Sequence, residues 1–248
     1  MEKENKIKKF LNWLWNSDSI LSFIILLLLI FIFIKLILFP SISLIFGTSL
    51  PLAIVESSSM DHNALAYCKS YGSNLNCIEK STDFEICGSK FPEKQFLDKE
   101  KYWQTCGSWY EKKNITQEQF SEFKFSNGFR KGDIMIIIGK DPKDLKVGDV
   151  LIFKSTRAHP IIHRLISLYP LATKGDHNSE QIVGSKDYYG TDETNIQESQ
   201  IIGVAVGKIP HIGLIKIYAI EHPFVFWPIV LIIIFLSFNP FKKKHKNI

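Results

Sequence analysis

The sequence predicts a mainly β domain that is carried on an N-terminal transmembrane helix. Three observations lead to this prediction. A long apolar run fills residues 20–46, short β-prone runs separated by glycine, proline and aspartate fill residues 129–218, and a polar stretch at residues 61–128 contains all four cysteines. We therefore expect a membrane anchor, a β domain with an inserted cysteine-containing subdomain, and a second transmembrane helix near the C-terminus.

The apolar run from Ile20 to Phe46 is long enough to cross a membrane. As far as Ile34 its one polar residue is Ser22, and Lys35 is its first charged residue. A hydrocarbon core about 30 Å thick needs about 20 helical residues, and a lysine near the outer interface can extend its ammonium group into water. The run is longer than the roughly 7–15 apolar residues of a cleaved signal peptide, so we expect an uncleaved anchor.

Basic clusters beside the apolar runs predict the topology. The second apolar run, Pro223 to Phe238, is short for a full span. The lysines that flank the two runs are Lys3, Lys6, Lys8 and Lys9 at one end, and Lys242, Lys243, Lys244 and Lys246 at the other. Because positively charged flanks stay on the cytoplasmic side, we expect both termini in the cytoplasm, residues 47–222 outside it, and the protein in the cell membrane.

The chain is thus divided into consecutive segments with different compositions. They are a cytoplasmic amphipathic lead-in at 1–18, the anchor at 19–46, an extracytoplasmic β domain at 47–222 that contains the insert 61–128, the second transmembrane helix at 223–239, and a basic cytoplasmic tail at 240–248. The net charge of +5, with 22% charged residues, is too small to indicate a nucleic-acid partner.

Short runs rich in β-branched residues predict the strands. The runs are residues 52–55, 133–138, 149–153, 161–166, 200–206 and 214–218. Within the insert a short helix is expected at 116–123, because Thr116 and Gln119 have the spacing of a capping box.

The cysteines agree with a location outside the cytoplasm. Four cysteines without paired Cys-x-x-Cys spacing indicate two disulfides in an oxidising compartment, with three possible pairings; free thiols or a zinc site are the alternatives. The four are Cys68, Cys77, Cys87 and Cys106. Asn114-Ile115-Thr116 forms an acceptor sequon for N-glycosylation, which is also consistent with exposure outside the cytoplasm.

Three side chains are candidates for a serine-protease site. Ser59 ends a serine cluster just past the anchor, and a hydroxyl needs a neighbouring base to become a nucleophile. His163 lies within an apolar strand, and an imidazole suits that base. Asp176 lies in a turn-like segment, where a carboxylate can orient an imidazole. Taken singly, the three also fit a serine-rich loop, a half-buried strand histidine and a Gly-Asp turn.

Four motifs, taken in order, resemble the boxes of the signal peptidase I family. They are Ser57-Ser58-Ser59-Met60, Gly148-Asp149 with the apolar residues after it, Pro160-Ile161-Ile162-His163-Arg164, and Thr173-Lys174-Gly175-Asp176-His177-Asn178. They resemble the archaeal and endoplasmic-reticulum branch, because bacterial members have lysine in place of His163. The resemblance implies a signal-peptidase-like β domain, with Ser59 as nucleophile, His163 as general base and Asp176 as the supporting acid.

The resemblance also implies an oxyanion hole. The Ser57 hydroxyl would join the Ser59 backbone N–H in binding the oxyanion.

The sequence differs from this branch of the family at one position. In this branch a second acidic residue commonly follows the Gly-Asp-x-Asn box by about half a dozen positions, but residue 182 is isoleucine. Glu180 is close but shifted, and Asp187 lies in a segment similar to one that bacterial members carry. Asp176 is the first choice as the partner of His163, and Asp187 is the second.

The resemblance implies removal of leader peptides from exported proteins by acyl transfer to serine. Expected partners are signal-peptide-bearing preproteins, the lipid bilayer and the protein export channel. No cofactor or metal is expected, and the metalloprotease motif His-Glu-x-x-His is absent from the sequence. Two alternatives stay open: a non-catalytic, membrane-tethered binding module, and a specialised maturation protease for pilin-like or surface proteins.

Overall fold

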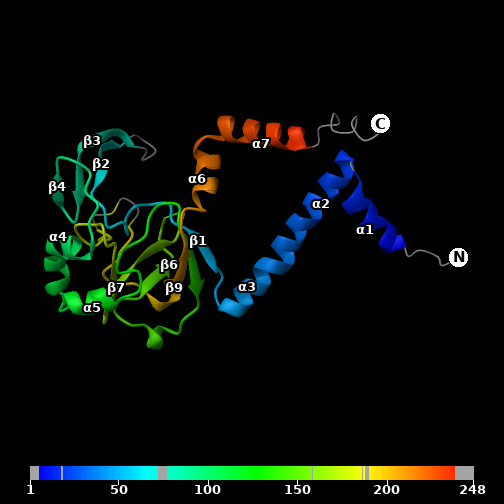
Figure 1. Cartoon of the computed structure of the whole chain (residues 1–248). Coiled ribbons are helices and arrows are strands. Elements are labelled where there is room, and N and C mark those ends of the chain that lie inside the picture. The colour runs from blue at the N-terminus through cyan, green and yellow to red at the C-terminus, as the bar shows by residue number, and fades with distance from the viewer. Residues whose placement is uncertain are drawn as a thin grey trace. The chain divides into compact units, whose positions relative to one another are not determined.

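A computed structural model describes residues 6–17, 19–71, 77–157, 159–185, 187 and 190–237 of the chain. The chain forms two compact units, a terminal unit of residues 1–45 with 216–248 and a central unit of residues 46–215 (Figure 1). The lysine-rich C-terminal tail and Lys3 lie outside the described residues.

The anchor is one continuous helix. It consists of α2 (Ile20–Phe33), a π-helical segment (Ile34–Leu38) and α3 (Phe39–Phe46), and it follows the amphipathic helix α1 (Lys6–Asn16). The Ser19 hydroxyl caps its start by accepting a hydrogen bond from the Leu21 N–H. Within the described part of the chain, this is the one single helix that is long and apolar enough to cross a membrane. An N-terminal membrane anchor fits this helix.

The expected strand at 214–218 is wrong. These residues begin α6 (Leu214–Glu221), which is followed by α7 (Pro223–Ser237). Their backbone groups make hydrogen bonds within a helix instead of with a neighbouring strand. α6 and α7 are together long and apolar enough for a span, but they bend by 114°, so the second transmembrane helix stays a prediction.

The central unit is built on a six-stranded antiparallel sheet in the order β1-β5-β9-β6-β7-β8. The strands are β1 (Leu52–Ile54), β5 (Ile134–Ile138), β6 (Val150–Phe153), β7 (Ile161–Leu168), β8 (Leu171–Lys174) and β9 (Ile201–Ile209), with short 3₁₀ turns at Pro142–Asp144 and Glu198–Gln200. Five of these strands lie where the sequence predicts them; β8 was missed. Because of its many helices the whole chain is mixed rather than mainly β.

The burial of β6 shows that both faces of the sheet are covered at this strand. Its four residues are all buried, although neighbours in a strand point to opposite faces. Val150 and Ile152 belong to one hydrophobic core, with Met60 and Phe129 on the same side. Leu151 and Phe153 belong to a second core on the opposite face, with Leu165. A strand buried on both faces reads as a continuous apolar run.

The insert is a compact structure of its own. It contains a three-stranded sheet and two helices: β2 (Leu65–Tyr71), β3 (Cys77–Ile86), β4 (Ser89–Phe91), α4 (Lys99–Glu111) and α5 (Gln117–Glu122). The capping box of α5 is confirmed, because Thr116 and Gln119 make both reciprocal bonds. The cysteines join as Cys68–Cys77 and Cys87–Cys106. The small sheet and α4 were not predicted.

The two ends of the insert meet where it leaves the central sheet domain. The Phe129 N–H donates to the Met60 carbonyl at 3.0 Å. The insert has its own aromatic core, which includes Tyr102, Tyr110 and Phe120 and extends onto β7 and β8 through two residues of those strands, Ile166 and Ala172. β2 to β4 and the two helices gather at one side of the large sheet (Figure 1). The insert therefore packs directly on β7, which carries His163, and on β8, which leads into Asp176.

Candidate active site

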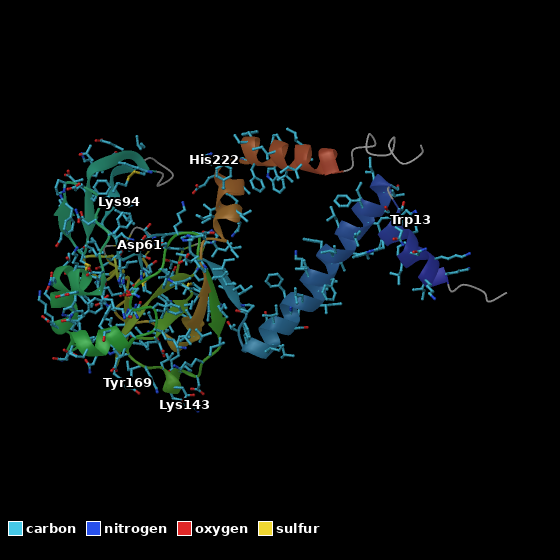
Figure 2. All side chains as sticks on the ribbon, in the orientation of Figure 1. Trp13, Asp61, Lys94, Lys143, Tyr169 and His222 are labelled. Carbon is cyan, nitrogen blue, oxygen red and sulfur yellow. A yellow bond between two sulfur atoms is a disulfide. The ribbon has the colours of Figure 1, made fainter. Side chains whose placement is uncertain are left out.

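The serine cluster forms a turn directly after β1, an edge strand of the sheet. The Asp61 N–H donates to the Ser58 carbonyl at 3.0 Å, which closes the turn. Ser59 is half-buried, and its hydroxyl lies 3.1 Å from the hydroxyl of Ser57. Buried Met60 anchors the turn in the core, and buried Asp61 begins the insert (Figure 2). Ser59 is thus held close to the surface by a fixed backbone.

His163 lies in β7, opposite Leu151 of β6, and is 4% exposed. Its Nδ1 hydrogen-bonds to Oε1 of Glu193. The Glu193 carboxylate also accepts hydrogen bonds from the Thr173 hydroxyl at 2.9 Å and from the Ile182 N–H at 2.8 Å. Because the ring nitrogen that faces a carboxylate carries the proton, we assign the proton to Nδ1 and the lone pair to Nε2. This is the tautomer that a general base needs.

Glu193 is charged despite its burial. Burial alone would raise the pKa of its carboxyl group, but the neighbouring His163 ring and the hydrogen bonds from Ile182 and Thr173 together lower that pKa below its ordinary value. A carboxylate in this state can stabilise an imidazolium ion when one forms on His163.

Gly175 brings Ser59 and His163 together. A Cβ atom on Gly175 would lie 2.8 Å from Nε2 of His163 and 2.8 Å from the carbonyl oxygen of Ser59. A side chain does not fit at such distances, so the position requires glycine. The His177 N–H donates to the same Ser59 carbonyl at 2.9 Å. The segment after β8 therefore links the serine turn to the base, while the described hydrogen bond of the Ser59 hydroxyl goes to Ser57.

Asp176 belongs to a different cluster, centred on Arg164. Both residues are fully buried. The guanidinium group binds the carboxylate in bidentate fashion, from Nε at 2.9 Å and from Nη2 at 2.6 Å. Its remaining N–H groups donate to the backbone carbonyls of Lys124, Phe125 and Gly148 at 3.0–3.1 Å. Burial would raise the pKa of Asp176, but the Arg164 charge holds it well below the usual range.

The insert completes this cluster. His62 Nε2 lies 2.9 Å from Oδ2 of Asp176, and the Tyr110 hydroxyl donates to Oδ1 at 3.0 Å. The His62 ring stacks on Tyr102 at 3.7 Å between ring centroids. Burial lowers the pKa of His62 below its ordinary value, although Asp176 acts in the opposite direction. His62 is therefore neutral at pH 7 and donates its Nε2–H to the carboxylate.

The expectation that Asp176 supports His163 is not what the structure shows. Neighbours along β7 point to opposite faces, and β8 pairs so that Lys174 stands opposite Arg164. Asp176 follows Lys174 by two residues, just beyond the end of β8, and its side chain contacts Arg164. Of the other candidates, Glu180 accepts from the Trp109 ring N–H at 2.8 Å, and Asp187 pairs with Arg157. Among the described hydrogen bonds, that of His163 goes to Glu193 and to none of these three carboxylates.

Glu193 is the residue that sequence reasoning missed. It lies 30 residues beyond His163, in a polar stretch outside the predicted strands. The chain turns back there, so that the Thr173 N–H donates to the Glu193 carbonyl at 2.9 Å. The one available signal was a cluster of acidic residues at positions 192 and 193 after the last box. Without the strand register, that signal does not distinguish Glu193 from Asp187.

Lys174 is a buried cation on the Arg164 side of β8. Its Nζ donates to the Gly175 carbonyl at 3.0 Å. It also lies 4.9 Å from the centre of the Trp109 ring and 5.2 Å from that of Tyr110. Burial lowers the pKa of Lys174 to about 8, although Asp176 and Glu193 both act to raise it. This lysine therefore holds the carbonyl group of Gly175, the glycine that lies next to both Ser59 and His163.

Comparison with curated proteins finds catalytic subunits of signal peptidase complexes. The chain is 29% identical over 117 residues to the signal peptidase complex catalytic subunit SEC11 of Plasmodium falciparum, which is 44% of this chain and 61% of that protein. It is 30% identical over 105 residues to the corresponding subunit of Sclerotinia sclerotiorum, 39% of this chain and 59% of that one. The chain is also 30% identical over 103 residues to the signal peptidase complex catalytic subunit sec11 of Dictyostelium discoideum, which is 38% of this chain and 55% of that protein.

These relatives confirm the resemblance to signal peptidases that the four motifs indicate. The chain spans about three fifths of the length of the curated relatives that it matches. No protein-family model matches the chain.

Lys174 predicts a pH dependence of stability. Its pKa of about 8 in the folded chain lies below the ordinary 10.5. Between these values the unfolded chain holds a proton that the folded chain has released, so the free energy of unfolding rises with pH in this window. In Lys174→Met this contribution is absent. From pH 7 to pH 10 we expect the wild type to gain about 1–3 kcal/mol of unfolding free energy relative to Lys174→Met.

Urea unfolding of the detergent-solubilised chain at the two pH values measures this difference. Lys143→Met is the control, because the Lys143 side chain is 77% exposed and lies at the surface (Figure 2); its unfolding free energy should change with pH as that of the wild type does. An equal gap between wild type and Lys174→Met at pH 7 and pH 10 would contradict the assignment.

Proposed function

We propose that this chain is a membrane-anchored serine endopeptidase that removes signal peptides from exported proteins. The observation that carries the proposal is that Ser59 and His163 both lie next to Gly175, while Glu193 hydrogen-bonds to the other ring nitrogen of His163. A nucleophile, a base and a carboxylate that orients the base are the three groups that acyl transfer to serine requires. The relatives are named as signal peptidase catalytic subunits, which agrees with this chemistry and names its substrate.

In the proposed reaction the Ser59 hydroxyl oxygen attacks the scissile carbonyl carbon, and its proton passes to Nε2 of His163. The imidazolium ion donates through Nδ1–H to the Glu193 carboxylate, which stabilises the positive charge. The C–N bond then breaks, and the leaving amine takes the proton from Nε2. A water molecule attacks the acyl-enzyme with His163 again as base, which releases the acid product and restores the Ser59 hydroxyl.

The serine turn also provides the donors for the oxyanion. We propose that the Ser57 hydroxyl and the Ser59 backbone N–H bind it, because Ser57 is exposed and its hydroxyl lies 3.1 Å from that of Ser59. Donors aimed at the developing negative charge contribute strongly to such reactions. The substrate would add as a strand beside β1, the edge strand that leads into the turn.

The anchor helix supports a membrane location in which the central unit faces away from the cytoplasm. The two disulfides of that unit agree with an oxidising compartment. The sequence analysis expected the cell membrane, whereas the eukaryotic relatives favour the membrane of the endoplasmic reticulum. Common to both is an export membrane with the active site on its outer or lumenal side. Because the relatives are subunits of a complex, we propose membrane protein partners for this chain too.

Replacing the nucleophile tests the proposal directly. We expect Ser59→Ala to lower kcat for cleavage of a leader-bearing preprotein by at least about 10³-fold, because triad residues act as a unit. Ser58→Ala is the matched control: it removes a neighbouring hydroxyl from the same turn and should keep the wild-type rate. A serine-directed acylating probe should label the wild type and Ser58→Ala but not Ser59→Ala. Cleavage by Ser59→Ala at the wild-type rate would rule out the assignment.

Neutralising each carboxylate in turn tests whether Glu193 or Asp187 supports His163. We expect Glu193→Gln to lower kcat by about 10²–10⁴-fold, because the imidazolium ion on His163 loses its counter-charge. Asp187→Asn should stay within about twofold of the wild type, because the described partners of Asp187 are Arg157 and the Thr191 N–H rather than His163. Both variants are compared in the same leader-cleavage assay. The reverse pattern, with loss in Asp187→Asn alone, would identify Asp187 as the partner.

The sequon tests the topology. Asn114 lies in an exposed turn after α4, where oligosaccharyl transfer on the lumenal side can reach it. When the chain is inserted into glycosylating microsomes, we expect one glycan that an endoglycosidase removes, and none on Asn114→Gln. Protease added outside the vesicles should leave residues 46–215 intact. Digestion of that unit in sealed vesicles would show the opposite orientation.

A further inference from the structure

The segment Gly175–Asn178 is held on two sides by different parts of the central unit. On one side it contacts the serine turn: the His177 N–H donates to the Ser59 carbonyl at 2.9 Å, and the Asp176 N–H lies 3.3 Å from the Met60 sulfur. A backbone group bonded to the residue that carries the nucleophile fixes the position of that residue. Whatever holds Gly175–Asn178 therefore also holds Ser59.

On the other side the segment is held by the insert. The Tyr102 hydroxyl of α4 donates to the Asp176 carbonyl at 2.8 Å. The Cys87 N–H, in the turn between β3 and β4, donates to the His177 carbonyl at 2.9 Å. Two consecutive carbonyl groups thus receive their hydrogen bonds from the insert. The Asp176 carbonyl belongs to the same peptide plane as the His177 N–H that donates to Ser59, and the His177 carbonyl belongs to the next plane.

The two donors belong to one cross-linked body. Cys87 is joined to Cys106 of α4, and Cys106 lies one helical turn after Tyr102 on the same helix. The disulfide therefore fixes the Cys87 turn relative to the Tyr102 hydroxyl. Tyr102 and Cys106 are both almost fully buried, and the Tyr102 ring also stacks on His62. The second disulfide, Cys68–Cys77, joins β2 to β3 and has no described contact with Gly175–Asn178.

We propose that the insert is a positioning element of the active site, in which Tyr102 and the Cys87–Cys106 disulfide hold the 176–177 peptide against Ser59. This inference rests on the proposed function. If the insert's hydrogen bonds are lost, the 176–177 peptide can move, and Ser59 then leaves its alignment with His163. Because a displacement of about 1 Å can cost about 10²-fold in rate, the loss should fall on kcat. Substrate binding along β1 involves none of these groups, so KM should change little.

The experiment compares the two disulfides in the full-length, detergent-solubilised chain. At a temperature at which thermal unfolding shows every variant folded, we expect Cys87→Ala/Cys106→Ala to lower kcat for leader cleavage at least about tenfold, with KM within about twofold. The matched Cys68→Ala/Cys77→Ala variant loses a cross-link of the same insert and should keep kcat within about twofold. Labelling by the acylating probe should slow in the first variant and not in the second.

A single-atom change provides a second measurement that does not depend on the disulfide. Tyr102→Phe removes only the hydroxyl and keeps the ring that stacks on His62, so it should fold even if the cysteine variant does not. We expect it to lower kcat about three- to tenfold at unchanged KM, in keeping with one lost hydrogen bond. Tyr67→Phe, on β2 of the same insert and away from Gly175–Asn178, is the control and should retain the wild-type kcat.

Reduction gives a third readout. With dithiothreitol, the wild type and Cys68→Ala/Cys77→Ala should lose activity together, whereas Cys87→Ala/Cys106→Ala should show no further loss. This inference would be overturned if folded Tyr102→Phe kept the wild-type kcat, or if its effect were confined to KM. In that case the Ser59→Ala result would still support the proposed function. A wild-type chain that neither cleaves nor reacts with the probe would overturn the proposed function and this inference with it.

Discussion

The bidentate ion pair between Arg164 and Asp176 is the interaction on which the central unit depends. Both partners are fully buried, every N–H group of the guanidinium has an acceptor, and the carboxylate also accepts from His62 and Tyr110. Removing one partner of a buried pair typically costs about 3–5 kcal/mol, because an uncompensated charge stays in the interior. This pair joins β7, the segment after β8, and the insert in one network.

Because side chains alternate along β7, His163 and Arg164 point to opposite faces of the strand and meet different neighbours. His163 points to the face where Glu193 and Thr173 lie, and Arg164 points to the face where Asp176 and the insert lie. In the proposed reaction the His163 face carries the proton transfer, while the buried ion pair occupies the Arg164 face. Asp176 and Glu193 are both buried carboxylates with lowered pKa values, but their partners differ: a guanidinium group that is always charged, and an imidazole that can take up a proton.

The insert folds as a subdomain of its own and contacts the segment after β8. Its ends meet at Met60 and Phe129, so the sheet is not interrupted by the extra residues. Its aromatic core continues onto β7 and β8 and excludes water from the Arg164–Asp176 pair, which strengthens the attraction between the two charges. The insert also makes four polar contacts with Asp176 and His177, from His62, Tyr102, Tyr110 and Cys87.

The sequence by itself determined the features that depend on local pattern. Apolar length predicted the anchor helix, runs of β-branched residues predicted five strands of the large sheet, and the Thr116–Gln119 spacing predicted the cap of α5. The motifs also singled out Ser59 and His163, which both lie next to Gly175, and Asp176, which pairs with Arg164 instead of His163. Only the tertiary structure decided which carboxylate reaches His163, because strand register sets which face each residue points to, and register is a long-range property. The same limit applies to residues 214–218, whose apolar run resembles a strand but forms α6. It also applies to the cysteine pairs, whose connectivity depends on how the insert folds.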